Sequence, residues 1–396
     1  MKKYIAIILF KSMSSLLLAF LPLFLMKVYG SEFSGEFTYY FSLVVVFSVF
    51  VKLGLDVDFI KRNAKFKLRL SRFNSAYNTS LLVFFILNAL LVYIVLNFIF
   101  DYFVSLSLAL CILAFSVISL CSTYFYNNYR LFFGLFFGSA GWVFIFIVLS
   151  SFFSHNVYYI LCISLLFPFF LFLYLFKDRF LLLRVRKFVI LFYFIAPSYF
   201  VIAFVPISFN YLSNLFVGEM YGYDSLANYV AITRYGFVIS FVFISINQFV
   251  SHRIRTAFMS HGYVDEFPNY VIKVNKYLFW ISSLVFLIMF STLGLYIDYL
   301  SLSDWLYYPA LIFMTGSYFN SATGCVASVL TMTGYQTFVS RVLLLSFAFF
   351  SFLCVLLIDF NLLGVTVSYL LAMIFQNVIL LLKVKKEHNF NPVSVF

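Results

Sequence analysis

Residues 29–62 read YGSEFSGEFTYYFSLVVVFSVFVKLGLDVDFIKR, and their pattern decides the fold. The centre of this stretch is almost entirely apolar, whereas Glu32 and Glu36 lie near its start and Lys61 and Arg62 at its end. A helix crosses the ~30 Å hydrocarbon core of a membrane with about 20 apolar residues. The stretch therefore predicts one membrane-spanning helix with an acidic end and a basic end.

The composition extends this interpretation to the whole chain. Of the 396 residues, 64% are hydrophobic, 10% are charged and 59 are Phe. A water-soluble domain could not bury so much apolar surface, so we expect lipid to surround it. The first apolar run is interrupted by Lys11 and is followed by no small-residue cleavage site, which favours a retained helix over a signal peptide. The sequence predicts an all-α polytopic membrane protein.

Apolar windows along the chain indicate twelve transmembrane helices. We expect them at residues 5–28, 37–57, 78–100, 103–126, 132–153, 157–176, 188–216, 226–250, 277–297, 306–332, 341–358 and 364–382. Because twelve is an even number, both termini should lie on the same side of the membrane.

Charged residues alternate between the connections. Lys and Arg concentrate in one set, of which residues 61–72 alone hold six, while the other set is acidic and has Lys27 as its nearby cation. Cytoplasmic connections carry an excess of Lys and Arg, so we expect the basic set and both termini in the cytoplasm. Anionic lipids of the inner leaflet then account for the net charge of +12, and nucleic acid is not an expected partner.

The pattern of residues 29–62 recurs 192 residues later, in residues 221–254. The offset pairs Tyr29 with Tyr221, Gly30 with Gly222, Glu32 with Asp224, Phe37 with Tyr229, Val46 with Val238, Ser48 with Ser240, and Lys61 with Arg253. It predicts two six-helix bundles, residues 1–187 and 188–396, related by a parallel pseudo-twofold repeat. Such repeats place a transporter's substrate between the bundles. Since no filter segment is evident, we favour a transporter over a channel.

Several kinds of chemistry lack their sequence signatures. The chain contains no G-x-x-x-x-G-K-[ST] phosphate-binding loop, and its four histidines and five cysteines have no metal-ligand spacing. The connections are too short for a soluble catalytic domain. We therefore expect no catalytic residues, no metal and no cofactor, with an enzyme built from short loops as the alternative.

Charges inside the spans are the candidate functional residues, because burying a charge in a membrane costs roughly 2.5–3.5 kcal/mol on insertion scales. Arg234 lies about eight residues, or ~12 Å, inside its span and should face a wet cavity or a buried acid. Lys11 lies inside the first span, where its long stem could also reach the headgroups. Lys27 lies at the other end of that span. A functional role and ordinary anchoring at the membrane interface are equally compatible with its position.

Lys52 and Asp56 stand four residues apart in the second span, where a helix would place them on one face. Their pairing could simply lower the cost of insertion near the membrane boundary. In the functional interpretation, Asp56 is a protonatable ion-coupling group that releases Lys52 during transport. The residues alone leave both interpretations open.

Four segments resemble, in order, those of the O-antigen and polysaccharide flippases, the polysaccharide transporter branch of the multidrug/oligosaccharidyl-lipid/polysaccharide exporter superfamily. They are KLGLDVDFIKR at residues 52–62, VGEMYGYDSLANY at 217–229, TMTGYQ at 331–336, and LLGVTVSYLLAMIFQNVILLLKVKKEHNFNP at 362–392. Together with the span count, the similarity covers essentially the whole chain. The family often has an acid followed by a base where this chain has Ser213 and Asn214, so no ion-coupling role is carried over to that position.

The resemblance implies a transporter with a central cavity, located in the bacterial inner (plasma) membrane. Its implied substrate is an undecaprenyl-pyrophosphate-linked oligosaccharide, such as an O-antigen repeat unit, carried from the inner to the outer leaflet by ion-coupled alternating access. Such a flippase serves lipopolysaccharide or other polysaccharide biosynthesis, and its implied partners are the lipid bilayer, a polysaccharide polymerase and a chain-length regulator.

A pyrophosphate group needs cations to enter a low-dielectric cavity, and Arg and Lys hold it by charge-assisted hydrogen bonds. We therefore expect Arg234 first, then Lys11 and Lys27, to bind the substrate, and Asp56 with Lys52 to serve ion coupling. Two rival functions remain. An organic-cation (multidrug) antiporter of the same superfamily would prefer an acidic cavity, and a peptidoglycan-precursor flippase would commonly have additional helices.

Overall fold

The computed structural model describes residues 2–54, 71–127, 130–153, 156–175, 197–261 and 266–392. These residues form helices joined by short turns, and no β-strand occurs among them. The expected all-helical architecture is thereby confirmed for this part of the chain.

The chain divides into two compact units, Met1–Ala227 (unit 1) and Asn228–Phe396 (unit 2). The division falls inside the long helix α10 (Pro197–His261), which begins in unit 1 and continues into unit 2. The predicted bundles, residues 1–187 and 188–396, were defined by a sequence repeat, and that assignment stays a prediction.

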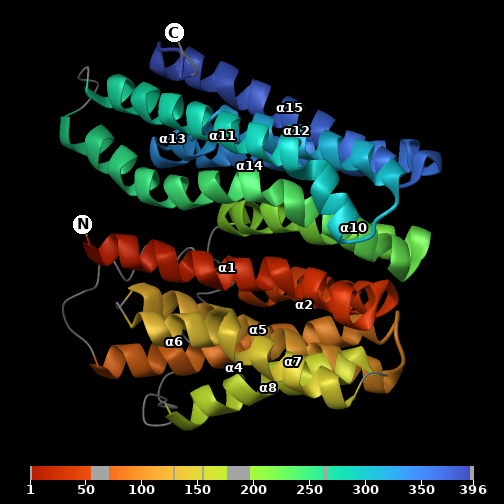
Figure 1. Ribbon diagram of the computed structural model, residues 1–396. Helices are drawn as coiled ribbons and strands as arrows, with labels where there is room; N and C mark the ends of the chain where they lie inside the picture. Colours follow the sequence, from red (N-terminus) through yellow and green to blue (C-terminus); the bar gives the residue numbers. More distant parts are fainter. Residues whose placement is uncertain are drawn as a thin grey trace. The chain divides into compact units, whose positions relative to one another are not determined.

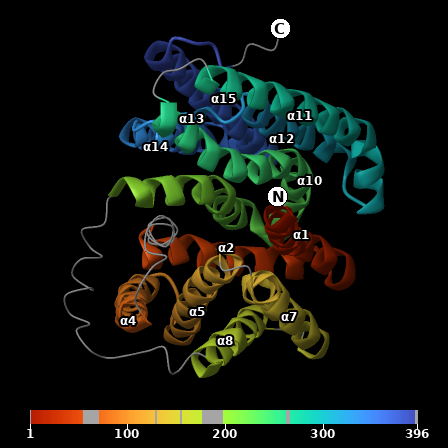
Figure 2. The same cartoon turned by 90° about the vertical axis from the view of Figure 1, so that its left-hand side faces the viewer.

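Unit 1 packs around helices α2 and α5. Its elements are α1 (Lys2–Tyr29), α2 (Ser31–Lys52), α4 (Ser71–Leu96), α5 (Tyr102–Asn127), α6 (Leu131–Leu135), the π-helix η1 (Phe136–Ala140), α7 (Gly141–Phe152), α8 (Val157–Leu175) and the first part of α10. Helix α5 contacts α2, α4 and α8, and α8 also contacts α7. Figure 2 shows α4, α5, α8 and α7 side by side and nearly end-on.

Unit 2 is built around α12 and α15. It contains the second part of α10, followed by α11 (Glu266–Tyr299), the 3₁₀ turn η3 (Asp304–Leu306), α12 (Tyr307–Ala322), α13 (Val326–Met332), α14 (Gln336–Leu356), the 3₁₀ turn η4 (Ile358–Phe360) and α15 (Asn361–His388). Helix α15 packs against α12 and α14, and α12 packs against α11 (Figure 1). The Phe313 and Tyr369 rings stack at 4.4 Å between α12 and α15.

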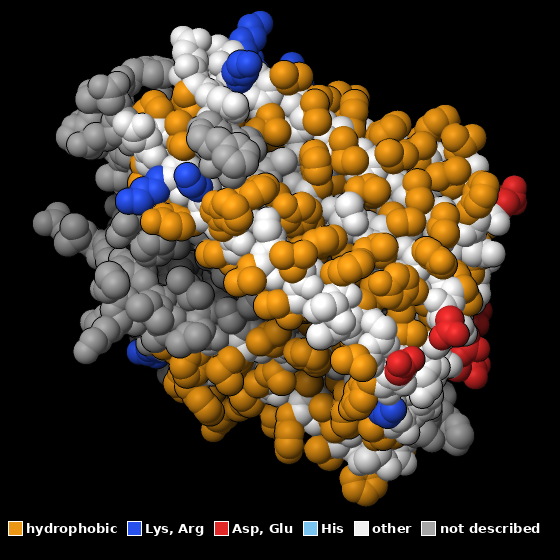
Figure 3. All heavy atoms as spheres, turned by 45° about the horizontal axis from the view of Figure 1, so that its top comes forward, with side chains coloured by type: hydrophobic (Ala, Val, Ile, Leu, Met, Phe, Trp, Pro, Cys, Tyr) orange, Lys and Arg blue, Asp and Glu red, His pale blue; other side chains and the backbone are white. Residues whose placement is uncertain are grey.

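Eight helices in the described residues are long and apolar enough to cross a membrane. Two shorter apolar segments, Met13–Tyr29 and Leu81–Leu96, coincide with two further predicted spans. Large apolar side chains cover much of the face seen in Figure 3, and Phe98 and Phe152 are 87% and 77% exposed. These features agree with a polytopic membrane protein, and the count of twelve spans stays a prediction.

The described part of the span expected at residues 188–216 and the span expected at 226–250 fall in one long helix, α10. Its apolar segment Phe200–Ser240 has 41 residues, about twice what one crossing needs. At Gly222 the backbone leaves the helical conformation (φ 83°, ψ 172°), so α10 bends between the two predicted spans. A turn between two separate helices was expected at residues 221–224, whereas the structure has a kink within one helix.

Three other spans differ from the expected uninterrupted helices. Helix α2 ends at Lys52, because Leu53 (φ 45°) and Gly54 (φ 76°) turn the chain out of the helix. The span expected at 306–332 is broken between α12 and α13, at Gly324 (φ 79°). The span expected at 132–153 contains the π-helix η1.

Most charged residues described in unit 2 lie at opposite ends of the helices, with Glu266 and Glu387 as acids at the basic end and Arg234 within α10. Asp298, Asp304 and Asp359 lie at the α11–α12 and α14–α15 junctions, which form the acidic end. The other ends of the same helices form the basic end and carry Lys273, Lys276, Arg341, Lys383, Lys385 and Lys386. This separation is what a membrane protein with one basic face requires.

Candidate functional site

Arg234 lies deep within an apolar segment of α10. It follows the kink at Gly222 by twelve residues, which corresponds to a rise of about 18 Å along the helix. Its side chain is half-buried, and its guanidinium carbon lies 6.0 Å from the centre of the Phe237 ring. Arg234 thus lies inside the 41-residue apolar segment Phe200–Ser240.

The helix that carries Arg234 is held firmly by its neighbours in unit 2. The Tyr235 hydroxyl donates to the Met289 carbonyl at 2.8 Å, and the Tyr235 ring stacks on Tyr296 at 4.2 Å. The Tyr296 hydroxyl in turn donates to the Ala231 carbonyl at 2.8 Å. A methyl group on Gly236 would meet the Phe313 ring at 2.6 Å, so only glycine lets α10 approach α12 there. These contacts fix the position from which Arg234 projects.

The two predicted lysine sites lie in α1 of unit 1. Lys27 is exposed in the last turn of α1, while the Lys11 side chain lies outside the described residues. Their sixteen-residue separation corresponds to about 24 Å along a helix, so they cannot bind one pyrophosphate group together. Because Arg234 belongs to unit 2, a cavity shared by the three cations stays a prediction.

Lys52 is buried at the end of α2, where its Nζ donates to Ser119 Oγ on α5 at 3.2 Å. The expected extension of this span to residue 57 as one helix was wrong, because α2 ends at Lys52 and Leu53 adopts a left-handed conformation. The pairing of Lys52 with Asp56 stays a prediction. Asp56 itself lies outside the described residues. The ion-coupling roles of both residues stay predictions.

Unit 1 contains a group of tyrosines and carboxylates that the sequence did not single out. We call Glu36, Tyr39, Tyr40, Tyr158, Glu219 and Tyr223 the tyrosine–carboxylate cluster. The Tyr39 hydroxyl donates to Glu219, and its ring centre lies 5.7 Å from that of Tyr223. The Tyr40 and Tyr158 rings lie 5.6 Å apart, and Glu36 is within electrostatic range of Tyr40, Tyr158 and Tyr223.

Close backbone packing assembles this cluster. A methyl group on Gly35 would lie 2.0 Å from the Tyr223 carbonyl oxygen, so the missing side chain lets α2 touch the α10 backbone beside its kink. A methyl group on Gly218 would meet the Tyr39 ring at 2.8 Å. Ser31 Oγ also donates to Asp224 Oδ1 at 2.5 Å. Helix α2 is therefore joined to α10 on both sides of Gly222.

Sequence reasoning missed the cluster because its partners are distant in the chain. Tyr39 and Glu219 are 180 residues apart, and Glu36 was considered only as part of an acidic loop. A usable signal was nevertheless present. The repeated Tyr-Gly-x-acid turns at residues 29–32 and 221–224 mark the two helix starts that the structure brings together.

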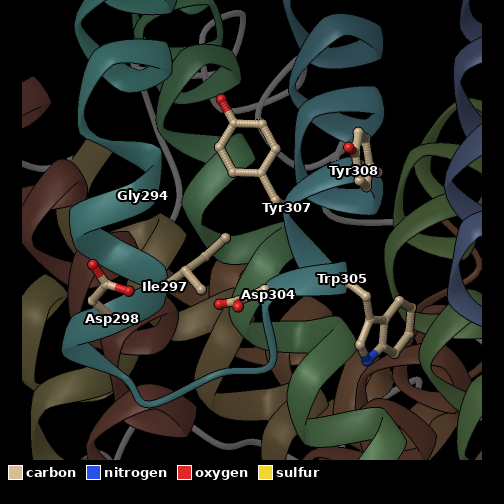
Figure 4. Close-up of a pocket in the computed structure, with 7 residues that line it drawn as sticks. All are labelled: Gly294, Ile297, Asp298, Asp304, Trp305, Tyr307 and Tyr308. Atoms are coloured by element: carbon tan, nitrogen blue, oxygen red, sulfur yellow. The ribbon is translucent and has the colours of Figure 1, made fainter.

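A cavity of about 420 Å³ lies at the acidic end of unit 2. It is lined by Gly294, Ile297, Asp298, Asp304, Trp305, Tyr307 and Tyr308. Figure 4 shows Asp304 pointing from η3 toward Ile297 and Asp298 of α11, with Trp305 on the other side of the start of α12. The lining contains two carboxylates and no Lys or Arg, so this cavity is unsuited to a pyrophosphate group.

No three His, Cys, Asp or Glu side chains in the described part of the chain are grouped to hold a metal ion. All five cysteines are buried free thiols. Arg234, Lys52 and the tyrosine–carboxylate cluster contain charged side chains that are candidates for a functional role.

No protein-family model matches this chain, and no curated protein matches it at a significant level. The chemistry of the residues and the resemblance of four sequence segments to the polysaccharide flippases are therefore the grounds for proposing a function.

Proposed function

We propose that the chain is a flippase that carries an undecaprenyl-pyrophosphate-linked oligosaccharide from the inner to the outer leaflet of the bacterial inner membrane by alternating access. The observation that carries the proposal is the half-buried Arg234 within the apolar segment Phe200–Ser240 of α10. A permanently charged side chain at such a position needs a polar partner or water. During transport, an anionic substrate group has the charge that this side chain attracts.

The chemistry of arginine fits a pyrophosphate group. The guanidinium stays charged at any physiological pH and presents several N–H donors in a planar fork that matches phosphate oxygens. Because Tyr235 and Tyr296 fix the helix next to Arg234, little ordering of the backbone is needed when the anion binds. Prior ordering of this kind reduces the entropic cost of binding.

In this proposal the two ends of the protein have different roles. The basic end faces the cytoplasm, where the anionic carrier lipid is loaded, and the acidic end faces the side to which the glycan is delivered. A polysaccharide polymerase and a chain-length regulator are the partners that would use the delivered glycan. Asp56 and Lys52 remain the proposed ion-coupling residues.

A second candidate function is organic-cation antiport, which the tyrosine–carboxylate cluster favours. Aromatic faces and carboxylates together attract organic cations, and Glu36 and Glu219 lie among four tyrosines. We place this function second because Arg234 would repel an organic cation that came near it. A peptidoglycan-precursor flippase uses the same carrier, so it differs from the first proposal only in the glycan.

Purified protein in proteoliposomes tests these functions directly. We expect a fluorescent undecaprenyl-pyrophosphate oligosaccharide to change leaflets faster than in protein-free vesicles, and a fluorescent organic cation to remain where it was added. A peptidoglycan precursor should be moved more slowly than a short surface-glycan unit. Movement of the cation without movement of the lipid-linked glycan would overturn the proposal in favour of antiport.

A further inference from the structure

Residues 389–392, which follow α15, fold back onto the basic end of unit 2. Helix α15 ends at His388, and Asn389 (φ 54°) turns the chain so that Pro392 is buried. The Pro392 carbonyl accepts a hydrogen bond of 2.9 Å from the Asn275 side-chain amide of α11. We call residues 389–392 the C-terminal strap.

Asn275 also holds the break between α12 and α13. Its Oδ1 accepts a hydrogen bond of 3.0 Å from the Cys325 backbone N–H and lies 3.1 Å from the Cys325 thiol. The Asn275 side chain is only 3% exposed and fits against Gly324, where a methyl group would lie 2.3 Å from Oδ1. One buried side chain therefore joins the strap to the broken span.

Further contacts seat the strap and the end of α15. The His388 Nε2 and Thr333 Oγ1 atoms lie 3.1 Å apart, and the Phe390 ring centre lies 6.1 Å from that of Phe267. The Tyr335 hydroxyl donates to Glu387 at 2.6 Å. The strap region thus reaches the start of α11 and the α13–α14 turn as well as the break.

We infer that the C-terminal strap controls how freely the α12–α13 break opens, with Asn275 as the positioning residue between them. A buried amide that loses a hydrogen-bond partner is destabilised, because its donor stays unsatisfied. This cost favours another orientation of the side chain. If Asn275 turns away, the Cys325 N–H loses its acceptor and the break loosens. Broken helices are sites of movement in transporters, and the inference holds whatever substrate is carried.

Cys325 is a built-in reporter of this opening. Its side chain is 1% exposed, so a membrane-permeant maleimide reaches it only when the break opens. Cys354, 4% exposed near the other end of α14, reports general loosening of the same unit. Mass spectrometry of the full protein measures alkylation at each of the two cysteines separately.

The decisive variants differ by one residue at the end of the chain. Truncation after Asn391 removes Pro392, whereas truncation after Pro392 keeps the residue that accepts the hydrogen bond. We expect the first truncation to raise the alkylation rate of Cys325 about tenfold, equivalent to 1.4 kcal/mol, and the second to leave it unchanged. Asn275→Ala should raise the rate at least as much, because it removes both contacts.

The rate at Cys354 should stay constant in all three variants. Unchanged Cys325 alkylation after loss of Pro392 would overturn the inference, and so would an equal rise at Cys325 and Cys354. Should Asn275→Ala fail to fold, the two truncations still decide, since they leave Asn275 in place.

Discussion

Gly30 and Gly222, 192 residues apart, adopt nearly the same backbone conformation, with φ 94° and ψ 170° at the first and φ 83° and ψ 172° at the second. Side chains other than hydrogen are almost excluded from this region of conformational space. Gly30 separates α1 from α2, and Gly222 forms the kink of α10. The two glycines paired by the sequence repeat are thus also paired in local geometry, which supports the proposed repeat.

Alanine at either glycine should destabilise the protein. Neither glycine has an atom within 4 Å of where a methyl group would lie, so the cost is that of the backbone alone, about 1–3 kcal/mol at each site. Denaturant unfolding in detergent measures it. Gly294→Ala is the matched control, because Gly294 is helical and has equally open space; that change should be neutral or stabilising by up to about 1 kcal/mol. Equal effects at all three positions would refute the backbone explanation.

Gly35→Ala should be costly for a different reason. The new methyl group would lie 2.0 Å from the Tyr223 carbonyl oxygen, and backbone on both sides leaves little room to adjust. Forcing α2 away from α10 should cost about 1–3 kcal/mol and weaken the Tyr39–Glu219 contact. The same unfolding measurement checks this, and full stability in the alanine variant would show that the helices do not touch there.

Tyr39 and Glu219 should be energetically coupled. In a double-mutant cycle of Tyr39→Phe and Glu219→Gln, we expect a coupling free energy of about 0.5–3 kcal/mol, because the two side chains share one hydrogen bond. Tyr174→Phe is the control partner for Glu219→Gln, since Tyr174 lies about 24 Å along α8 from Tyr158 of the cluster. The effect of Tyr174→Phe on the free energy of unfolding should simply add to that of Glu219→Gln. If the Tyr39→Phe effect were also additive with that of Glu219→Gln, the Tyr39–Glu219 hydrogen bond would be contradicted.

The orientation of unit 2 can be read by labelling single cysteines. Ser303→Cys lies at the acidic end and Lys386→Cys at the basic end, both at exposed positions, and the native cysteines are buried. A membrane-impermeant maleimide added to intact cells should label Ser303→Cys and should reach Lys386→Cys only after permeabilisation. The reverse pattern would invert the topology inferred from the charges.

Much of the helical architecture follows from the sequence, because the thickness of the bilayer sets the length of the apolar run that a membrane-spanning helix needs. Most of the predicted windows overlap helices in the described residues, and the turn at residues 221–224 marks the kink of α10. The early end of α2 at Lys52, the π-helix η1 and the break at Gly324 were not predicted. These irregularities depend on packing against other helices, which hydropathy does not record.

The candidate site was predictable only where a single residue violates the apolar pattern. Arg234 stands out because it is a charge in an apolar run, and the structure places it within the apolar part of α10; its depth in a membrane stays a prediction. The tyrosine–carboxylate cluster and the role of Asn275 arise from residues far apart in the chain, such as Asn275 and Pro392. Polar residues such as Asn and Tyr are common in helical proteins, so the sequence does not indicate which distant residue each of them contacts.

The central claim is that Arg234 binds the pyrophosphate group of a lipid-linked glycan. Its most direct test is the rate at which wild-type, Arg234→Ala and Arg234→Lys proteins move an undecaprenyl-pyrophosphate oligosaccharide between leaflets of proteoliposomes at equal protein content. Losing charge-assisted hydrogen bonds worth about 1.5–3 kcal/mol should slow the alanine variant about 10- to 100-fold, whereas lysine should retain part of the rate. A wild-type rate in a correctly folded Arg234→Ala protein would contradict the account.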